Sequence, residues 1–280
     1  MKILLTGASG FLGQHILSES RSQGHEVMCL RHSEFENCEE KVRSFAPNIL
    51  IHAAWGGVSA ADRNDASVQQ QNINMSRYLV DLYPYRQIIG LGSQDEYGVI
   101  SEVVDEGHPL CPVSEYAKAK IAVCNYIADK CADRGSEWQW IRIFNMYGIH
   151  QADNWLIPAI IRRCIGGEQS MDTTKGEQCY AYLYSADFAR AVVSMCGAHD
   201  KSGIYNLSSS HPLPLKEIFL KIKELTCADI AFHFGAIPYR PNQSMMICGN
   251  SQKFKDTFGD FEKTTFEEGL REIINSYKNE

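Results

Sequence analysis

TGASGFLG, residues 6–13, follows directly on an apolar run at residues 2–5 and opens an amphipathic segment that starts at residue 11. Its three glycines lie three residues apart, where a predicted strand passes into a predicted helix. Glycine suits a turn with positive φ, close ligand approach to backbone amides, and tight packing of helix on strand. The amides and dipole at a helix N-terminus favour phosphates, although glycine triplets also occur in surface turns. This position between strand and helix predicts a turn that binds the pyrophosphate of a dinucleotide, through Gly7, Ser9, Gly10, Phe11, Leu12 and Gly13.

Outward from this turn, short apolar runs alternate with longer amphipathic segments. The runs expected to be strands are residues 2–6, 25–30, 48–54, 87–93 and 138–145. The alternation predicts an α/β fold, a Rossmann-type doubly wound parallel sheet with crossover helices on both faces, one of them at residues 115–133.

After Gly148 the pattern is less regular. We expect helices at 156–166, 186–198, 215–224 and 266–277, and strands at 179–183 and 203–207. We therefore assign the dinucleotide-binding domain to residues 1–148 plus about 178–207. A smaller, interleaved C-terminal lobe that binds substrate is expected from about 149–177 plus 208–280.

The composition limits the classes of partner. The net charge is −7 and there is no run of basic residues, which argues against nucleic acid and against an anionic membrane surface. The apolar stretch at residues 3–5 is too short for a secretory leader or a membrane span, so we expect a cytoplasmic protein. The ten cysteines form no CxxC pair, and we predict neither a disulfide framework nor a metal site.

The residue after the second expected strand bears on the choice of dinucleotide. NAD-binding folds usually carry an Asp or Glu there, which binds the ribose 2′-hydroxyl. Here the strand ends at Leu30 and Arg31 follows. Because a guanidinium can hold a 2′-phosphate that a carboxylate would repel, we predict NADP(H) as the preferred cofactor, with NAD(H) possible. In the alternative interpretation, Arg31 is a solvated loop residue and Glu34 or Glu36 binds the ribose of NAD(H).

Tyr116 and Lys120 lie four residues apart, on one face of the expected helix. An ammonium near a phenol stabilises the phenolate and lowers the phenol's pKa, which suits proton transfer at neutral pH. The spacing alone is weak evidence, because Tyr126 and Lys130 repeat it about 80° further round the helix. We favour Tyr116 because it begins the helix and lies downstream of Ser93, at the carboxyl end of a strand, where functional groups of doubly wound folds gather.

The motifs occur in one order along the chain: TGASGFLG, NILIHAAW (48–55), Asn72, GSQDEYG (92–98), YAKAK (116–120) and RIFNMYG (142–148). In that order they resemble the extended short-chain dehydrogenase/reductases, the nucleotide-sugar epimerases, dehydratases and reductases, over essentially the whole chain. The resemblance implies that Ser93, Tyr116 and Lys120 are catalytic. It implies cofactor contacts at Ala53, Ala54, Asn72, Tyr116, Lys120 and Phe144. It implies substrate contacts at Ser93, Gln94, Asn145, Trp155 and Arg240, the last in a segment, 240–243, that looks like the family's RPxD.

Three departures from the family's pattern narrow the expected activity. The Thr-Asp-Glu of dehydratases is replaced by Ser93-Gln94-Asp95, so we expect no dehydration. The family's phosphate-binding Arg-Asp pair is replaced by Tyr180-Ala181, which leaves more of that role to Arg240. So few residues separate Arg31 from the strand at 48–54 that the sheet strand usually found between them is expected to be missing or degenerate.

The resemblance and Arg31 together favour a reductase. The expected reaction is NADPH-dependent reduction of a nucleotide-linked 4-keto-6-deoxysugar to the 4-hydroxy deoxysugar, for bacterial surface polysaccharide synthesis. An NAD-dependent nucleotide-sugar 4-epimerase is the close alternative, and a non-catalytic NADP-binding regulatory protein is a second. We interpret His52 as a packed structural residue, and Trp55 as a border of the pocket or a cover for the sheet end. The resemblance also implies a homodimer, formed by the helices that carry Asn72 and Lys120.

Overall fold

A computed structural model describes residues 1–59, 61–241 and 243–279, so Asn242 of the segment 240–243 lies outside the described residues. The strands are β1 (Lys2–Thr6), β2 (Glu26–Leu30), β3 (Ile49–His52), β4 (Gln87–Leu91), β5 (Val103–Val104), β6 (Glu137–Ile143), β7 (Asn145–Tyr147), β8 (Ser170–Thr173), β9 (Cys179–Tyr184), β10 (Gly203–Leu207), β11 (Pro212–Pro214), β12 (Ala231–Phe234) and β13 (Met246–Gly249). The α-helices are α1 (Phe11–Ser22), α2 (Glu39–Phe45), α3 (Ala66–Asp81), α4 (Glu115–Arg134), α5 (Leu156–Ile165), α6 (Ser185–Ser194), α7 (Leu215–Thr226), α8 (Gln252–Phe258) and α9 (Phe266–Lys278). The 3₁₀ turns are η1 (His32–Asn37), η2 (Asp62–Asn64) and η3 (Gln94–Tyr97).

The predicted parallel sheet is confirmed. Its strand order is β10-β6-β4-β3-β1-β2, and every pairing in it is parallel. The order reverses at β1, which has β2 on one side and β3 on the other, and ligands of open α/β sheets bind at such a switch point. Between β2 and β3 the chain forms η1 and α2 and no strand, as the short spacing predicted.

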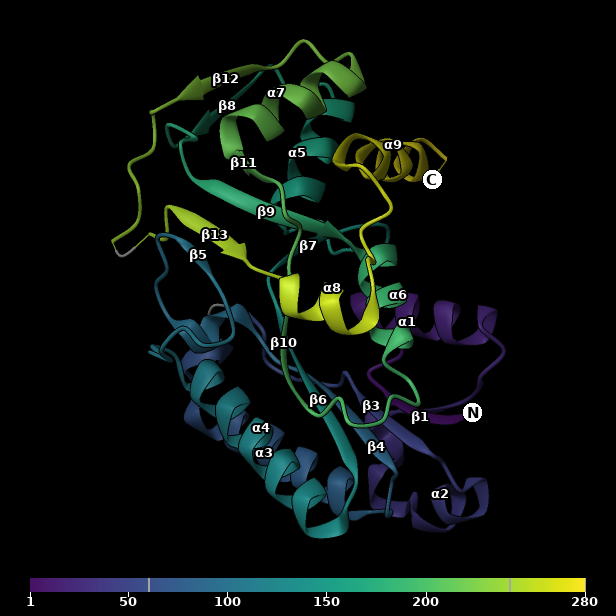
Figure 1. The fold of residues 1–280 in the computed structure, drawn as a ribbon. Coiled ribbons are helices and arrows are strands. Elements are labelled where there is room, and N and C mark those ends of the chain that lie inside the picture. Colours follow the sequence, from purple (N-terminus) through teal and green to yellow (C-terminus); the bar gives the residue numbers. More distant parts are fainter. Residues whose placement is uncertain (60, 242, 280) are drawn as a thin grey trace.

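Helices cover both faces of this sheet. One face packs apolar side chains of β1, β3 and β6 against α1, α6 and α8, with Ile16, Phe188 and Phe254 fully buried. The other face packs against α2, α3 and α4, with Val42, Leu79 and Val123 fully buried. Figure 1 shows α3 and α4 side by side along the second of these faces. The doubly wound arrangement follows from strands that are apolar on both sides.

A second lobe stands over the carboxyl ends of the parallel strands (Figure 1). It contains a sheet in the order β11-β9-β13-β5, with β7 paired to β9, and a two-stranded sheet of β12 and β8. Helices α5, α7 and α9 enclose an apolar core with the tyrosines of β7 and β9. Since β9 pairs within this lobe, the elements of 178–207 that join the parallel sheet and its covering helices are β10 and α6.

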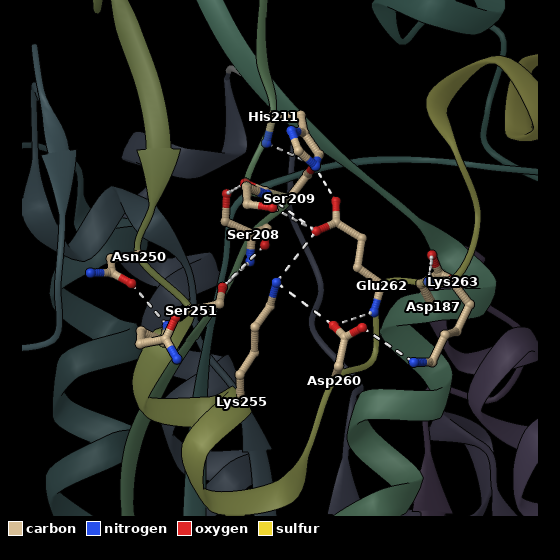
Figure 2. A network of polar contacts seen from close by, with 12 residues as sticks. Asp187, Ser208, Ser209, His211, Asn250, Ser251, Lys255, Asp260, Glu262 and Lys263 are labelled. Atoms are coloured by element: carbon tan, nitrogen blue, oxygen red, sulfur yellow. Dashed lines mark hydrogen bonds and ion pairs between the residues drawn. The ribbon is translucent and has the colours of Figure 1, made fainter.

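The segment between α8 and α9 is fastened to the rest of the chain by carboxylates (Figure 2). Glu262 accepts a hydrogen bond from the Ser209 hydroxyl, after β10. The fully buried carboxylate of Asp187, in α6, accepts the backbone amides of Lys263 at 3.0 Å and Thr264 at 2.8 Å. These bonds fasten the start of α9, a helix of the second lobe, to the parallel-sheet lobe. Among the described helices, none combines the length and the apolar character needed to cross a bilayer.

Candidate active site

A cavity of about 460 Å³ opens at the carboxyl ends of β1, β3 and β4, between the two lobes. The structure brings most of the predicted site residues to its wall: Gly7, Gly10, Phe11, Leu12, Gly13, Ala53, Ser93, Gln94, Tyr116, Lys120, Phe144, Asn145 and Trp155. Ser9, Arg31, Ala54, Asn72 and Arg240 do not line it. The cavity therefore joins the glycine turn to the Tyr116/Lys120 pair.

The glycine turn has the geometry that the sequence predicted. Gly7 has φ +73°, and a Cβ there would lie 2.6 Å from the Ala54 nitrogen. A Cβ on Gly13 would overlap the Gly7 carbonyl oxygen. At Gly10, by contrast, a Cβ would meet the Gly7 carbonyl oxygen at 3.3 Å and would otherwise project into open space. The turn fits a pyrophosphate, because Gly10 leaves room before the N-terminus of α1, whose cap provides no side-chain hydrogen bond.

Arg31 lies exposed at the carboxyl end of β2, beside the glycine turn in the sheet. The Glu34 carboxylate accepts the Arg31 backbone amide at 2.9 Å and the Lys41 ammonium at 2.7 Å. Each oxygen of the Glu34 carboxylate thus accepts one hydrogen bond from within the chain. The side chain of Glu36, the other acidic alternative, lies outside the described part of the chain.

Ser93, Tyr116 and Lys120 meet at the centre of the cavity wall. The Ser114 hydroxyl caps α4 by accepting the Ala117 amide at 3.1 Å, so Tyr116 stands in the first turn of the helix. Ser93, which follows β4, lies beside Tyr116 on the cavity wall, where its side chain lowers the pKa of the phenol. The Lys120 ammonium lies 5.6 Å from the Tyr116 ring centroid and donates to the Leu91 carbonyl oxygen at 2.7 Å.

The two members of the pair have pKa values far from their ordinary ones. Burial lowers the pKa of Lys120 to about 7. Burial, followed by the negative charge of Asp95, raises the pKa of Tyr116 to about 12. The sequence-based expectation that the pKa of Tyr116 is lowered is therefore wrong for this structure, because loss of solvent outweighs the stabilising contacts of the phenolate.

Tyr126 and Lys130 lie outside the cavity. The Tyr126 hydroxyl donates to Asp81, and the Lys130 ammonium lies 3.2 Å from the same carboxylate. These contacts hold α4 against α3, so the interpretation of this second pair as structural is confirmed. Identical spacing thus gives the two pairs different surroundings on one helix, because Tyr116 faces Ser93 after β4 and Tyr126 faces Asp81 at the end of α3.

Arg63, on η2, was missed by the sequence reasoning. Its guanidinium carbon lies 4.8 Å from the Tyr116 ring centroid, and its Nη1 donates to Asp95. Both side chains line the cavity. Nothing in the polar stretch around residue 63 distinguishes this arginine from a solvated loop residue, because its partners come from elements far away in the sequence.

Asn72 lies beneath the loop after β3 rather than in the cavity wall. Its Nδ2 donates to the Gly56 carbonyl oxygen and its Oδ1 accepts the Gly56 amide, both at 2.9 Å. The neighbouring Gln69 accepts from Trp55 Nε1 at 3.0 Å and donates to the carbonyl oxygens of Gly57 at 3.1 Å and Asp62 at 3.0 Å. The predicted cofactor residue Asn72 is therefore found holding the loop that carries Trp55 and Arg63.

Glu96, in the GSQDEYG segment at residues 92–98, binds other residues inside the fold. It is fully buried and accepts the Ser93 amide at 3.0 Å, Trp140 Nε1 at 2.9 Å and Arg142 Nε at 2.8 Å. It does not line the cavity, where Gln94 and Asp95 do. The carboxylate next to the Ser93 hydroxyl on this wall is thus that of Asp95.

The far end of the cavity offers polar and aromatic groups. Gln94 Oε1, Asn145 Nδ2 and Gln151 Oε1 are buried without a protein partner, which leaves two acceptors and one donor for a polar ligand. Trp155, 46% exposed, and Tyr182 complete the wall. Arg240 is exposed on the loop after β12, near Tyr180, and does not reach the cavity wall.

His52 and Trp55 follow the sequence-based interpretations. The buried His52 ring is hydrogen-bonded to the Thr6 hydroxyl at 2.9 Å and the Ser76 hydroxyl at 2.8 Å. Burial, then the charge of Lys120, lowers its pKa to about 3. It is a neutral structural residue, whereas Trp55 borders the cavity.

Comparisons with known proteins agree with this arrangement. The family model described as "NAD dependent epimerase/dehydratase family" matches residues 3–208. GDP-L-colitose synthase of Yersinia pseudotuberculosis is 28% identical over 222 residues, covering 68% of this chain and 70% of the relative. A putative UDP-glucose 4-epimerase of Methanocaldococcus jannaschii is 24% identical over 99% of this chain and 98% of the relative. The crystal structure of UDP-glucose 4-epimerase with UDP-glucose from Thermotoga maritima has a TM-score of 0.88 at 22% identity, covering 100% of this chain and 99% of that one.

Proposed function

Because this chain belongs to the NAD dependent epimerase/dehydratase family, we propose that it reduces a nucleotide-linked 4-keto-6-deoxysugar to the 4-hydroxy deoxysugar with NADPH. The observation that carries the proposal is the meeting of Ser93, Tyr116 and Lys120 on the wall of one cavity that begins at the glycine turn. The relative named GDP-L-colitose synthase, which matches 68% of the chain, supports a deoxysugar product.

The nicotinamide dinucleotide, when bound, supplies the hydride that the ketone carbon receives. In the proposed reaction the Tyr116 hydroxyl gives its proton to the ketone oxygen, so that one O–H bond breaks and another forms. The Ser93 hydroxyl donates a hydrogen bond that orients the same oxygen. Lys120 would hold the ribose of a bound dinucleotide, and its ammonium lies on the side of the Tyr116 ring, 5.6 Å from the centroid. The orphaned amides of Asn145 and Gln94 bind polar groups of the nucleotide sugar.

The preference for NADPH is supported by two residues, Arg31 and Glu34, that follow the edge strand β2. Arg31 is solvent-exposed at the carboxyl end of β2, where it can reach a 2′-phosphate. The nearby Glu34 carboxylate is engaged by Lys41 and by the Arg31 amide. These bonds turn the Glu34 carboxylate toward Lys41, so fewer of its lone pairs are left for a ribose hydroxyl. A reductase that consumes the cofactor once per turnover agrees with this choice.

A nucleotide-sugar 4-epimerase is the second candidate. It is favoured by the match to a putative UDP-glucose 4-epimerase over 99% of the chain. Such an enzyme would use the same Tyr116 in both directions, first removing the proton of the 4-hydroxyl group and then returning it. The cofactor would then be recycled within each turnover and NAD(H) would serve.

The purified protein incubated with a panel of nucleotide-linked 4-ketosugars and NADPH distinguishes the two, with products identified by NMR. The proposal predicts stoichiometric loss of NADPH absorbance and a 4-hydroxy product. In parallel, UDP-glucose is incubated with the protein and NAD. Interconversion with the 4-epimer, without net cofactor consumption and without ketosugar reduction, would replace the reductase by the epimerase.

A further inference from the structure

Arg63 is held over the catalytic tyrosine from two sides. Its Nη1 donates to Asp95 and its Nε donates to the Val58 carbonyl oxygen at 3.1 Å. The guanidinium carbon then lies 4.8 Å from the Tyr116 ring centroid. The Arg63 side chain is 30% exposed and the Asp95 side chain 22%, so the charge of each is only partly screened by solvent.

The loop that carries Arg63 is itself fixed to α3. Asn72 binds both backbone groups of Gly56, and Gln69 binds the carbonyl oxygens of Gly57 and Asp62. Two buried amide side chains therefore hold the loop from Gly56 to the start of η2, and Gln69 bonds to η2 itself. The position of the guanidinium is a property of the tertiary fold and not of a free side chain.

We propose that Arg63 is a positioning residue for the proposed reduction, which places a fixed positive charge against the phenolate formed when Tyr116 gives up its proton. This inference rests on the proposed function. Asp95 sets the size of the effect, because its carboxylate is the ion-pair partner of Arg63 and itself faces Tyr116. The chemistry balances without a further reactant: the Tyr116 O–H bond breaks, the proton moves to the ketone oxygen, and the negative charge stays on Tyr116.

The charges around Tyr116 come from three elements. Arg63 faces it from η2, Asp95 and Glu96 from η3, and Lys120 from its own helix. Arg63 lowers the pKa of Tyr116 while Asp95 and Glu96 raise it. The Glu96 carboxylate is already neutralised by Arg142 at 2.8 Å. Burial lowers the pKa of Lys120, which disfavours its charged form, and the charge of Arg63 lowers that pKa further, while Glu96 raises it. The guanidinium of Arg63 therefore adds a positive charge beside Tyr116 that does not come from Lys120.

Ionisation of Tyr116 can be measured without turnover. The full-length protein, labelled with ¹³C at tyrosine Cζ, is titrated by NMR up to the highest pH at which circular dichroism shows it folded. Tyr116→Phe assigns the resonance. The variants are Arg63→Gln, which removes the charge, Arg63→Lys, which keeps a positive charge, and Asp95→Asn, which removes the opposing carboxylate. The matched control is Arg77→Gln, since the Arg77 guanidinium carbon lies 5.1 Å from the ring of Tyr126, outside the cavity.

The proposal predicts a midpoint for Tyr116 that rises by about one pH unit in Arg63→Gln, seen as a smaller phenolate fraction at the highest pH, and falls by about one in Asp95→Asn. Arg63→Lys should lie closer to wild type than Arg63→Gln, and Arg77→Gln should leave Tyr116 unchanged. An unchanged midpoint in Arg63→Gln, or equal shifts in Arg63→Gln and Arg63→Lys, would overturn it. If the midpoints move as predicted and no ketosugar is reduced, the proposed function fails while the effect of Arg63 on Tyr116 stands.

Discussion

The Lys120 ammonium nitrogen lies 3.6 Å from the ring centroid of Trp55, at the inner end of the cavity. Trp55 is in turn fixed by a hydrogen bond from its Nε1 to Gln69 at 3.0 Å. An aromatic face and a carbonyl oxygen, that of Leu91 at 2.7 Å, replace the water around this charge. They do not replace it fully, since burial lowers the pKa of Lys120 to about 7.

The buried Lys120 should therefore make stability depend on pH. Its pKa is about 7 in the folded chain against 10.5 ordinarily, so between these values the unfolded chain binds the extra proton. The free energy of unfolding should rise with pH from about 7 to 10.5, relative to Lys120→Met. Urea unfolding of both proteins across this range measures the difference. The control is Lys118→Met, which changes an exposed lysine of the same helix, and parallel pH curves for Lys120→Met and wild type would contradict the prediction.

Tyr116→Phe should lower turnover with the ketosugar by about 10²- to 10⁴-fold, the range typical of a lost general acid. NADPH affinity should change little, because the ring and its packing remain. Tyr126→Phe is the matched control on the same helix and should keep full turnover, since its hydroxyl binds Asp81 outside the cavity. Steady-state kinetics with fluorescence titration of NADPH tests both, and undiminished turnover in Tyr116→Phe would remove this residue from the proposed mechanism.

The glycine turn separates a packing role from a binding role. Gly13→Ala should destabilise the fold, because the new Cβ would overlap the Gly7 carbonyl oxygen. Gly10→Ala should fold normally, since its φ is −79° and its Cβ would project largely into open space, yet it should weaken dinucleotide binding at least tenfold. Thermal melts and isothermal titration of the two variants give the comparison. Tight binding by Gly10→Ala would place the pyrophosphate elsewhere.

Asn72→Ala should act on the loop and, through it, on Arg63. The change leaves both backbone groups of Gly56 without their partners, at a cost of about 1–3 kcal/mol in the free energy of unfolding. Turnover should also fall, because the loop that leads to η2 loses its anchor at Gly56 and only Gln69 still holds it. Gln70→Ala, an exposed change on the same helix, is the control. Denaturant unfolding and kcat would show both effects, and a loss of cofactor affinity alone would return Asn72 to the role implied by the family resemblance.

Arg31→Ala should weaken NADPH binding about tenfold or more and leave NADH binding nearly unchanged. The guanidinium is proposed to contact only the 2′-phosphate, which NADH lacks. Separate calorimetric titrations with the two cofactors measure the ratio. Lys41→Ala, which frees the Glu34 carboxylate, should in contrast improve NADH binding. Equal affinities in wild type would remove the preference for NADPH.

Much of the fold was predictable because its signals are local. A helix that starts after a glycine turn, a serine cap before Tyr116 and apolar runs of strand length are each encoded by neighbouring residues. The short spacing between Arg31 and the next strand also predicted that the sheet strand usually found there is missing or degenerate, and between β2 and β3 the chain forms only η1 and α2. The sequence did not indicate that β9 belongs to the sheet of the second lobe and not to the parallel sheet. A buried strand has the same apolar pattern in either sheet.

By itself, the sequence determined the glycine turn at Gly7, Gly10 and Gly13 and the two candidate Tyr/Lys pairs on α4. The tertiary structure decided which pair faces the cavity, because the end of β4 brings Ser93 to Tyr116 and not to Tyr126. It also decided the electrostatics there. The lowered pKa of Lys120 depends on burial under Trp55, and the charge over Tyr116 depends on a loop pinned by Asn72 and Gln69. Solvation and charge proximity are properties of three-dimensional neighbours, so no spacing along the chain encodes them.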